Sequence, residues 1–242
     1  MERELDILFQ DQAAAGHNPQ STYRAADAEA FLELAASLNV SAPVLLLGAH
    51  IHRAVARPLS DGKRARYVDM VACLVVAAKF TDGIVKEDVQ ELLEHTKVTA
   101  AELLKAEVQI CSKVNWQLYC PNPITFLRCF SHDADGWNRQ TRSFAKVLLI
   151  GLTLHPVACS RFLPSTQASA ALYLAKGMLK MGTWTKQHES VCRIKEADLL
   201  ECAKDMLEAA RCASRICPDL FSEQHLRVIA RGRREVLAPN RA

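Results

Sequence analysis

The chain contains little glycine and little proline, nine of each in 242 residues. Half of its residues are hydrophobic, and among these Ala and Leu outnumber the β-branched types. Residues of this kind favour helices, and the two strongest helix-breaking residues are scarce. A chain of this length can bury one large core or two cores of about 100 residues each. The composition therefore predicts an all-α protein.

The sequence also lacks long apolar runs. None approaches the ~20 residues that a membrane-spanning helix needs. The first residues, Met-Glu-Arg-Glu-Leu, do not show the charged-then-apolar pattern of a secretory signal. We therefore expect no membrane association and a location in the nucleus, the cytoplasm or both.

No C-x-x-C pair occurs among the nine cysteines, and their number is odd. Structural zinc sites and secreted disulfide frameworks rest on paired, regularly spaced cysteines. We therefore predict nine free thiols, no metal site and no cofactor. The nine residues are Cys73, Cys111, Cys120, Cys129, Cys159, Cys192, Cys202, Cys212 and Cys217.

Signals for nucleic-acid binding and catalysis are weak. The net charge of +3 is too small to indicate nucleic-acid binding. The basic cluster at 227–234 is interpreted as the solvated face of a terminal helix, with a phosphate-contacting patch as the alternative. There is no G-x-S-x-G, P-loop or H-E-x-x-H motif. His50 and His52 do not share a helix face, and Asp133 and Asp135 beside a glycine indicate a loop. The chain is therefore not expected to be an enzyme.

One helical unit occurs twice. The segment V-L-L-L-G-A-H-I-H at 44–52 resembles V-L-L-I-G-L-T-L-H at 147–155 at seven of nine positions. The alanine-rich segment that ends at Lys79 parallels the one that ends at Lys176, at nearly the same offset. Chance similarity of amphipathic helices is the alternative. The two prolines in 119–123 stop the preceding helix and indicate the boundary.

Periodicity and capping signals locate the individual helices. Ser41 is an N-cap with Pro43 in the first turn, and Thr99 with Glu102 forms a capping box. The segment 182–192 is the least certain. The expected helices span 25–38, 43–55, 63–80, 85–95 and 99–118 in the first copy, and 124–130, 140–154, 165–181, 195–216 and 221–237 after it.

A carboxylate lies inside an apolar stripe of the fifth expected helix. Glu107 is near the centre of the arc formed by Leu103, Leu104, Val108, Ile110, Cys111, Val114 and Leu118. A carboxylate is expensive to bury alone and needs a cation or hydrogen-bond donors. Lys79, at the end of the central apolar helix, is the candidate partner. Such a pair is either an ordinary structural contact or a polar contact point within a docking surface, and the sequence context favours docking.

Several short motifs follow one another in the order found in the cyclin box, to which this chain is similar. The resemblance covers roughly residues 22–225. The matching elements are Lys79-Phe80, Glu107, Trp116-Gln-Leu118, P-N-P-I-T-F-L at 121–127 and F-L-P-S-T-Q-A-S-A-A-L-Y-L-A at 162–175.

The resemblance implies two tandem five-helix cyclin boxes with a C-terminal helical extension. On this basis we assign residues 1–21 to an N-terminal segment, 22–120 to the first box, 121–220 to the second box, and 221–242 to a C-terminal helix and tail.

Cyclins are regulatory subunits, so the resemblance implies a heterodimer with a cyclin-dependent serine/threonine kinase that the chain activates during cell-cycle progression. It implies no direct contact with nucleic acid and no catalytic residue in this chain. Lys79 and Glu107 would hydrogen-bond to a helix of the kinase. The apolar part of the groove would be lined by Phe80, Cys111, Trp116 and Leu118.

Some positions depart from the cell-cycle cyclins. Their M-R-x-x-L-x-x-W docking motif is replaced by the unrelated segment 23–30, so recognition of R-x-L substrates is not expected. His52-Arg53 is closer to transcription-type cyclins, whereas the second box is closer to mitotic ones. Three alternatives therefore remain: a transcription-type cyclin, a DNA-binding basal transcription factor of the IIB type, and a protein with this fold but no kinase partner.

Overall fold

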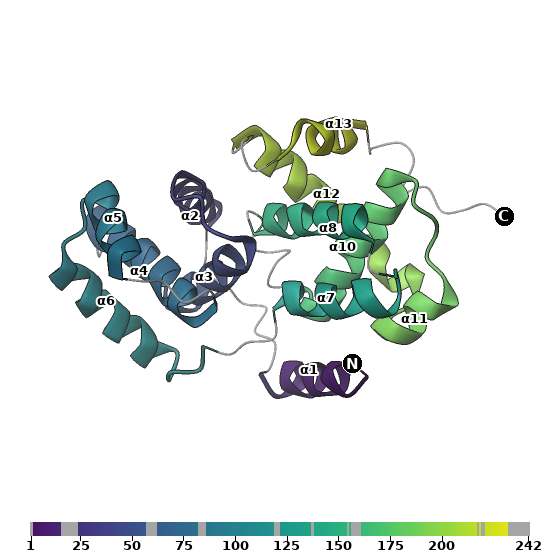
Figure 1. The fold of residues 1–242 in the computed structure, drawn as a ribbon, viewed down its shortest axis with the longest axis horizontal. Coiled ribbons are helices and arrows are strands. Elements are labelled where there is room, and N and C mark those ends of the chain that lie inside the picture. The colour runs from purple at the N-terminus through teal and green to yellow at the C-terminus, as the bar shows by residue number, and fades with distance from the viewer. Residues whose placement is uncertain are drawn as a thin grey trace. The chain divides into compact units, whose positions relative to one another are not determined.

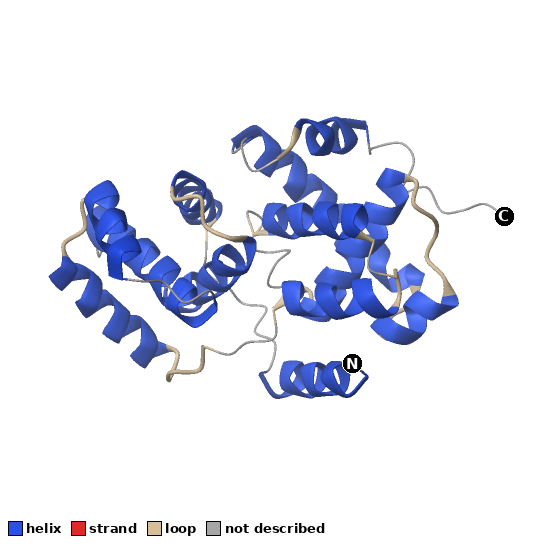
Figure 2. Ribbon diagram, in the orientation of Figure 1, coloured by secondary structure: helices blue, strands red, loops and turns tan. Residues whose placement is uncertain are grey.

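The structure, a computed structural model, is built from helices throughout the part of the chain that it describes, and no strand occurs there (Figure 2). That part comprises residues 2–15, 24–56, 62–81, 86–118, 122–136, 138–153, 155, 161–216, 218 and 221–231. The all-α prediction is confirmed. Within these residues, no helix is long and apolar enough to cross a membrane.

The chain forms two compact units. The first unit spans residues 22–120, and the second combines residues 121–242 with residues 1–21. The first unit contains α2 (Ala25–Ser37), α3 (Ala42–Val55), α4 (Lys63–Thr81), α5 (Lys86–Thr96) and α6 (Ala100–Lys113) (Figure 1). The second unit contains α1 (Glu2–Ala15), α7 (Pro123–Asp133), α8 (Arg139–Leu152), α10 (Pro164–Leu179), α11 (Lys186–Cys192), α12 (Glu196–Ile216) and α13 (Glu223–Arg231).

In the first unit α4 is the central helix and packs against α2, α3 and α6. Every residue from Val68 to Ala77 is buried, because this helix is apolar on all sides beyond its first turns. The prediction of an inaccessible segment 72–78 is correct except at Ala78, which is half-buried. The predicted capping signals are also present: Ser41 caps α3, and the Thr99 capping box starts α6.

Helix packing explains the glycine and the histidine of the repeated motif. A Cβ on Gly48 would lie 3.1 Å from Cζ of Phe31, and one on Gly151 would lie 2.8 Å from Cα of Ala210. Glycine is therefore required at Gly151, where a Cβ would clash with the backbone of α12, whereas at Gly48 the Phe31 ring would have to shift. His52 is buried and stacks on the Phe31 ring at 5.1 Å, and burial lowers the pKa of this imidazole to about 4. His52 is thus a neutral, packed residue in the core of the first unit.

In the second unit α10 is central and packs against α7, α8 and α12. The N-terminal helix α1 belongs to this unit and lies beside α7 (Figure 1). Its Phe9 ring is 5.3 Å from that of Phe126, and the guanidinium of Arg193 lies 4.5 Å above the Phe9 ring. Gln12 accepts a hydrogen bond of 2.9 Å from the backbone N–H of Ser165, in the first turn of α10. Residues 1–21, which the sequence assigns to neither box, thus form part of the second unit.

Four sequence expectations need correction or lie outside the described residues. Helix α6 ends at Lys113 instead of extending to 118, and the unassigned segment 182–192 contains α11. The end of the last expected helix, 232–237, lies outside the described residues, as do Cys120, Cys159 and Cys217. The six described cysteines are free thiols, as predicted. These six are Cys73, Cys111, Cys129, Cys192, Cys202 and Cys212.

Candidate functional site: the α4–α6 surface

Lys79 and Glu107 form the predicted ion pair. Lys79 Nζ, in the last turn of α4, lies 2.7 Å from Oε1 of Glu107 in the middle of α6. The Lys79 side chain is 49% exposed and the Glu107 side chain 13%. The lysine is therefore within reach of solvent or a partner, while the carboxylate is largely enclosed. A half-exposed ammonium group can form further charge-assisted hydrogen bonds with another protein.

Several large apolar residues that are close to this pair in the sequences of α4 and α6 have exposed side chains. Phe80 follows Lys79 and is half exposed, and Leu104 and Val108 of α6 are 63% and 51% exposed. Leu104 precedes Glu107 by three residues and Val108 follows it directly, so the apolar side chains flank the carboxylate on one side of α6. Exposed apolar side chains that gather around a polar contact are typical of a protein-interaction surface.

Trp116 is the most exposed large apolar residue described in the chain, at 67%. Asn115 and Trp116 both have left-handed backbone conformations, with φ of 52° and 60°. The backbone N–H of Trp116 donates to the Cys111 carbonyl at 2.8 Å, which folds the turn back onto the end of α6. A bulky residue with positive φ is strained, and such strain concentrates at functional sites. The turn holds the indole ring in solvent.

Cys111 lies one turn beyond Glu107 on α6 and is buried. Burial raises the pKa of its thiol; Glu107 raises it further and Lys79 lowers it. The thiol is therefore within electrostatic range of the ion pair. Cys111 is a buried, apolar part of the first unit and not a reactive thiol.

The sequence-predicted residues fall into two groups. Lys79, Phe80, Glu107 and Trp116 are accessible or partly accessible, whereas Cys111 is buried and Leu118 is half-buried. The sequence reading placed Leu104 and Val108 in the apolar stripe but did not recognise their exposure. Periodicity does not distinguish a side chain that faces the core from one that faces a partner. We call the following six residues the α4–α6 surface: Lys79, Phe80, Leu104, Glu107, Val108 and Trp116.

A second ion pair also joins α4 to α6. The guanidinium of Arg64 donates to both carboxylate oxygens of Glu102, at 3.2 and 2.9 Å, and to the Lys97 carbonyl at 2.8 Å. Arg64 is in the first turn of α4, at the opposite end of the helix from Lys79. This pair is exposed and provides an internal reference for the Lys79–Glu107 pair.

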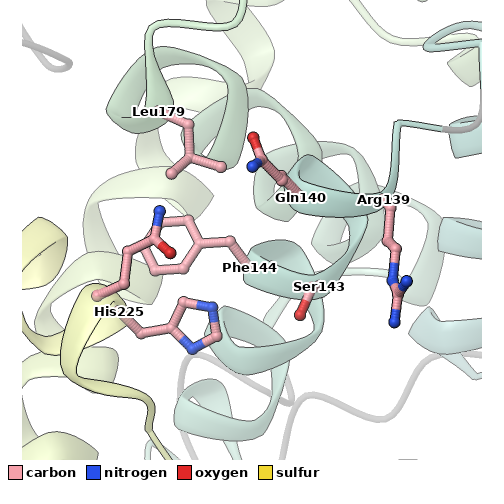
Figure 3. Close-up of a pocket in the computed structure, with 7 residues that line it drawn as sticks. Arg139, Gln140, Ser143, Phe144, Leu179 and His225 are labelled. Carbon is pink, nitrogen blue, oxygen red and sulfur yellow. The ribbon is translucent and has the colours of Figure 1, made fainter.

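The second unit contains a small pocket of about 190 Å³ between α8, α10 and α13 (Figure 3). The rings of Phe144 and His225 lie 5.2 Å apart, and burial lowers the pKa of His225. Among the residues that line the pocket, Arg139 carries a charged side chain, which in Figure 3 extends away from Phe144. Within the described part of the chain, no group of three or more His, Cys, Asp or Glu residues is arranged to hold a metal ion. The pocket residues are Arg139, Gln140, Ser143, Phe144, Leu179, Gln224 and His225.

Comparison with known proteins agrees with this architecture. Residues 121–219 match the family model of the cyclin C-terminal domain. The chain is 34% identical over 140 residues to the G2/mitotic-specific cyclin cdc13 of Schizosaccharomyces pombe, an alignment that covers 57% of this chain and 28% of that protein. It is 28% identical over 163 residues to the G2/mitotic-specific cyclin-4 of Saccharomyces cerevisiae, covering 65% of this chain and 35% of that protein.

A solved structure shows the same fold over both units. The viral cyclin from herpesvirus saimiri superimposes with a TM-score of 0.70 at 15% identity, covering 86% of this chain and 96% of that chain. The chain therefore contains a cyclin C-terminal domain at residues 121–219 and has the fold of a cyclin. It spans about a third or less of the length of the two mitotic cyclins above. Helices α7, α8, α10, α11 and α12 lie within the residues that match the cyclin C-terminal domain. We call α2–α6 the first box and these five helices the second box.

Proposed function

We propose that this cyclin binds and activates a cyclin-dependent serine/threonine protein kinase through the α4–α6 surface. The observation that carries the proposal is the Lys79–Glu107 pair, half accessible and flanked by exposed apolar side chains. A partly apolar helix of the kinase would bury Phe80, Leu104, Val108 and Trp116. The ion pair would fix its register through charge-assisted hydrogen bonds.

Activation would follow from the position of the bound kinase helix. In protein kinases a glutamate on one helix must reach the lysine that positions the ATP phosphates. A helix held inward by the α4–α6 surface would bring that glutamate into place, so the cyclin would act without contributing a catalytic group. Its relatives include two G2/mitotic-specific cyclins, which supports a role in cell division.

The proposal is tested by substitution of the two charged residues. Glu107→Ala leaves a cation without its partner in the interface, and Lys79→Ala leaves an enclosed carboxylate. Removal of one partner from a desolvated charged pair costs ~2–5 kcal/mol of binding. That loss corresponds to roughly 30-fold or more in Kd. We expect both variants to lose kinase activation, measured as histone-type phosphorylation by the co-purified kinase and as Kd with the isolated kinase.

Arg64→Ala is the matched control, because it also removes a cation of α4 that pairs with a glutamate of α6. It lies outside the α4–α6 surface, so its Kd and activation should equal those of the wild type. Circular dichroism should show that all three variants keep their helices. Folded Lys79→Ala and Glu107→Ala variants that activate the kinase normally would refute the proposal.

A further inference from the structure

A buried polar cluster joins α7, α10 and α11 within the second unit, the helices labelled in Figure 1. Lys176 of α10 forms an ion pair with Asp135, which follows α7, and only 9% and 6% of their side chains are exposed. Trp184 and His188 are buried beside each other, with ring centroids 4.9 Å apart. None of these residues takes part in the α4–α6 surface.

His188 caps the N-terminus of α11. Its Nδ1 atom lies 3.2 Å from the backbone N of Thr185 and 2.7 Å from the Thr185 hydroxyl oxygen. A backbone N–H only donates, so Nδ1 must be the unprotonated nitrogen and the neutral ring carries its proton on Nε2. In a capping box the N3 residue, three positions after the N-cap, is usually Glu or Gln. In α11 this residue is His188. Here the cap has an acceptor only while the imidazole is neutral.

The surroundings of His188 disfavour a second positive charge. Burial lowers the pKa of His188 from its ordinary value of 6.5, and Lys176 on α10 lowers it further. Asp135, at the end of α7, acts in the opposite direction but does not reverse the shift. On α11 itself, Lys186 is the first helical residue and Glu189 directs Oε1 to the backbone N of Glu196, at 3.2 Å.

Three contacts tie α11 to the rest of the second unit. Gln187 Nε2 donates to the Asp133 carbonyl of α7 at 3.0 Å, and Glu189 accepts the N–H of Glu196 in α12. Arg193, which ends α11, pairs with Asp6 of α1. Loss of the N-terminal cap would therefore weaken the attachment of α11 to three neighbouring helices.

We propose that α11 is a pH-sensitive latch, meaning a helix that is held in place only while its N-terminal cap is intact. Protonation of His188 removes the cap, and α11 then detaches from the neighbouring helices of the second unit. In the closed form Nδ1 accepts the Thr185 N–H, and a protonated Nδ1 cannot. In the open form His188 faces water and takes up a proton near its ordinary pKa of 6.5. The open form then binds more protons than the closed form, so opening increases as the pH falls below 6.5 and is independent of pH well above it.

Hydrogen exchange of the full chain tests the latch. After correction for the intrinsic rate, exchange of peptides covering α11 should rise by up to about tenfold between about pH 7.5 and about pH 5.5, because one proton is taken up on opening. His188→Gln keeps a side-chain acceptor for the cap but does not titrate in this range. This variant should show the same protection of α11 at both pH values.

His225→Gln is the matched control, because His225 is also a half-buried histidine with a lowered pKa but lies on α13. It should leave the pH response of α11 unchanged. A wild-type protein with no pH response in α11, or a His188→Gln variant with the full response, would overturn the proposal.

Fluorescence provides a second test that does not require a substitution at His188. With Trp116 and Trp137 replaced by phenylalanine, Trp184 reports on the adjacent imidazole, since imidazolium quenches indole more strongly than neutral imidazole does. Emission should change with a midpoint below pH 6.5. A constant emission across that range, in a protein that stays folded, would exclude protonation of His188 and the latch with it.

Discussion

The two cyclin boxes place a lysine at the same position of the repeat and use it in opposite ways. In the first box, Lys79 reaches forward in the chain to Glu107 on α6, and half of its side chain is exposed. In the second box, Lys176 reaches back to Asp135 at the end of α7, and both side chains are buried. The helices that carry the two lysines, α4 and α10, are the central helices of their units.

The difference lies in what each pair contributes to its own unit. The first pair is open to solvent at its lysine, so solvent screens it and it adds less to stability than a fully buried pair. A buried pair is already desolvated, so removal of either member leaves the other charge buried without a partner. A duplicated residue can therefore serve binding in one copy and internal organisation in the other.

The largest expected effect is the difference in how much each ion pair contributes to the free energy of unfolding. Lys176→Ala leaves the Asp135 carboxylate buried without its cation and should lower the free energy of unfolding by ~3–5 kcal/mol. Lys79→Ala should lower it by only ~0–1 kcal/mol, because that pair is partly solvated. Urea unfolding followed by circular dichroism, fitted for two units, measures both values.

The double variant Lys176→Met with Asp135→Asn is the control for that experiment. Because it removes both charges, it should recover much of the stability that Lys176→Ala loses. Equal losses for Lys79→Ala and Lys176→Ala would mean that the two pairs are energetically alike and that the comparison is wrong.

An intermediate effect is expected from the apolar part of the α4–α6 surface. Leu104→Glu or Val108→Glu places a charge where the proposed kinase helix would bury an apolar side chain, a contact worth ~1.5–3 kcal/mol. Kinase affinity should fall by roughly tenfold to a hundredfold, measured by titration calorimetry. Ile7→Glu changes an equally exposed apolar residue of α1 and should leave the affinity unchanged. A similar loss from all three would indicate a general effect of added charge.

The smallest effect on the fold is expected at Trp116. Trp116→Gly relieves the left-handed strain, while the greater freedom of glycine in the unfolded chain offsets that gain. The free energy of unfolding should therefore change by less than ~1 kcal/mol, although kinase affinity should fall. Thermal unfolding measures the change in stability, and titration with the kinase measures the change in affinity. A loss of several kcal/mol would show that the indole supports the first unit itself.

Apart from α11, the helices of both boxes could be predicted because their signals are local. Capping at Ser41 and Thr99 and the apolar run before Lys79 are visible in the sequence, and the structure has helices there. The Lys79–Glu107 pair could also be predicted, since a carboxylate within an apolar stripe requires a cation. That these two residues bind a kinase stays a prediction.

The missed features depend on tertiary context. The exposure of Leu104 and Val108 follows from how α6 packs on α4, which periodicity does not reveal. Asp135 was interpreted as a loop carboxylate because its partner Lys176 lies 41 residues away in the sequence. The end of α6 was placed too late because the turn uses Asn115 and Trp116 with positive φ instead of glycine.

The position of α1 makes the first cyclin box an insertion within the second unit. The chain starts with a helix of that unit, passes through all of the first box, and only then completes the unit. During synthesis the first box can fold as soon as it leaves the ribosome, while α1 waits for α7 and α10 to emerge. The hydrogen bond from Ser165 to Gln12 spans 153 residues, so it is among the last to close. A nascent chain would thus carry a folded α4–α6 surface before its second unit is complete.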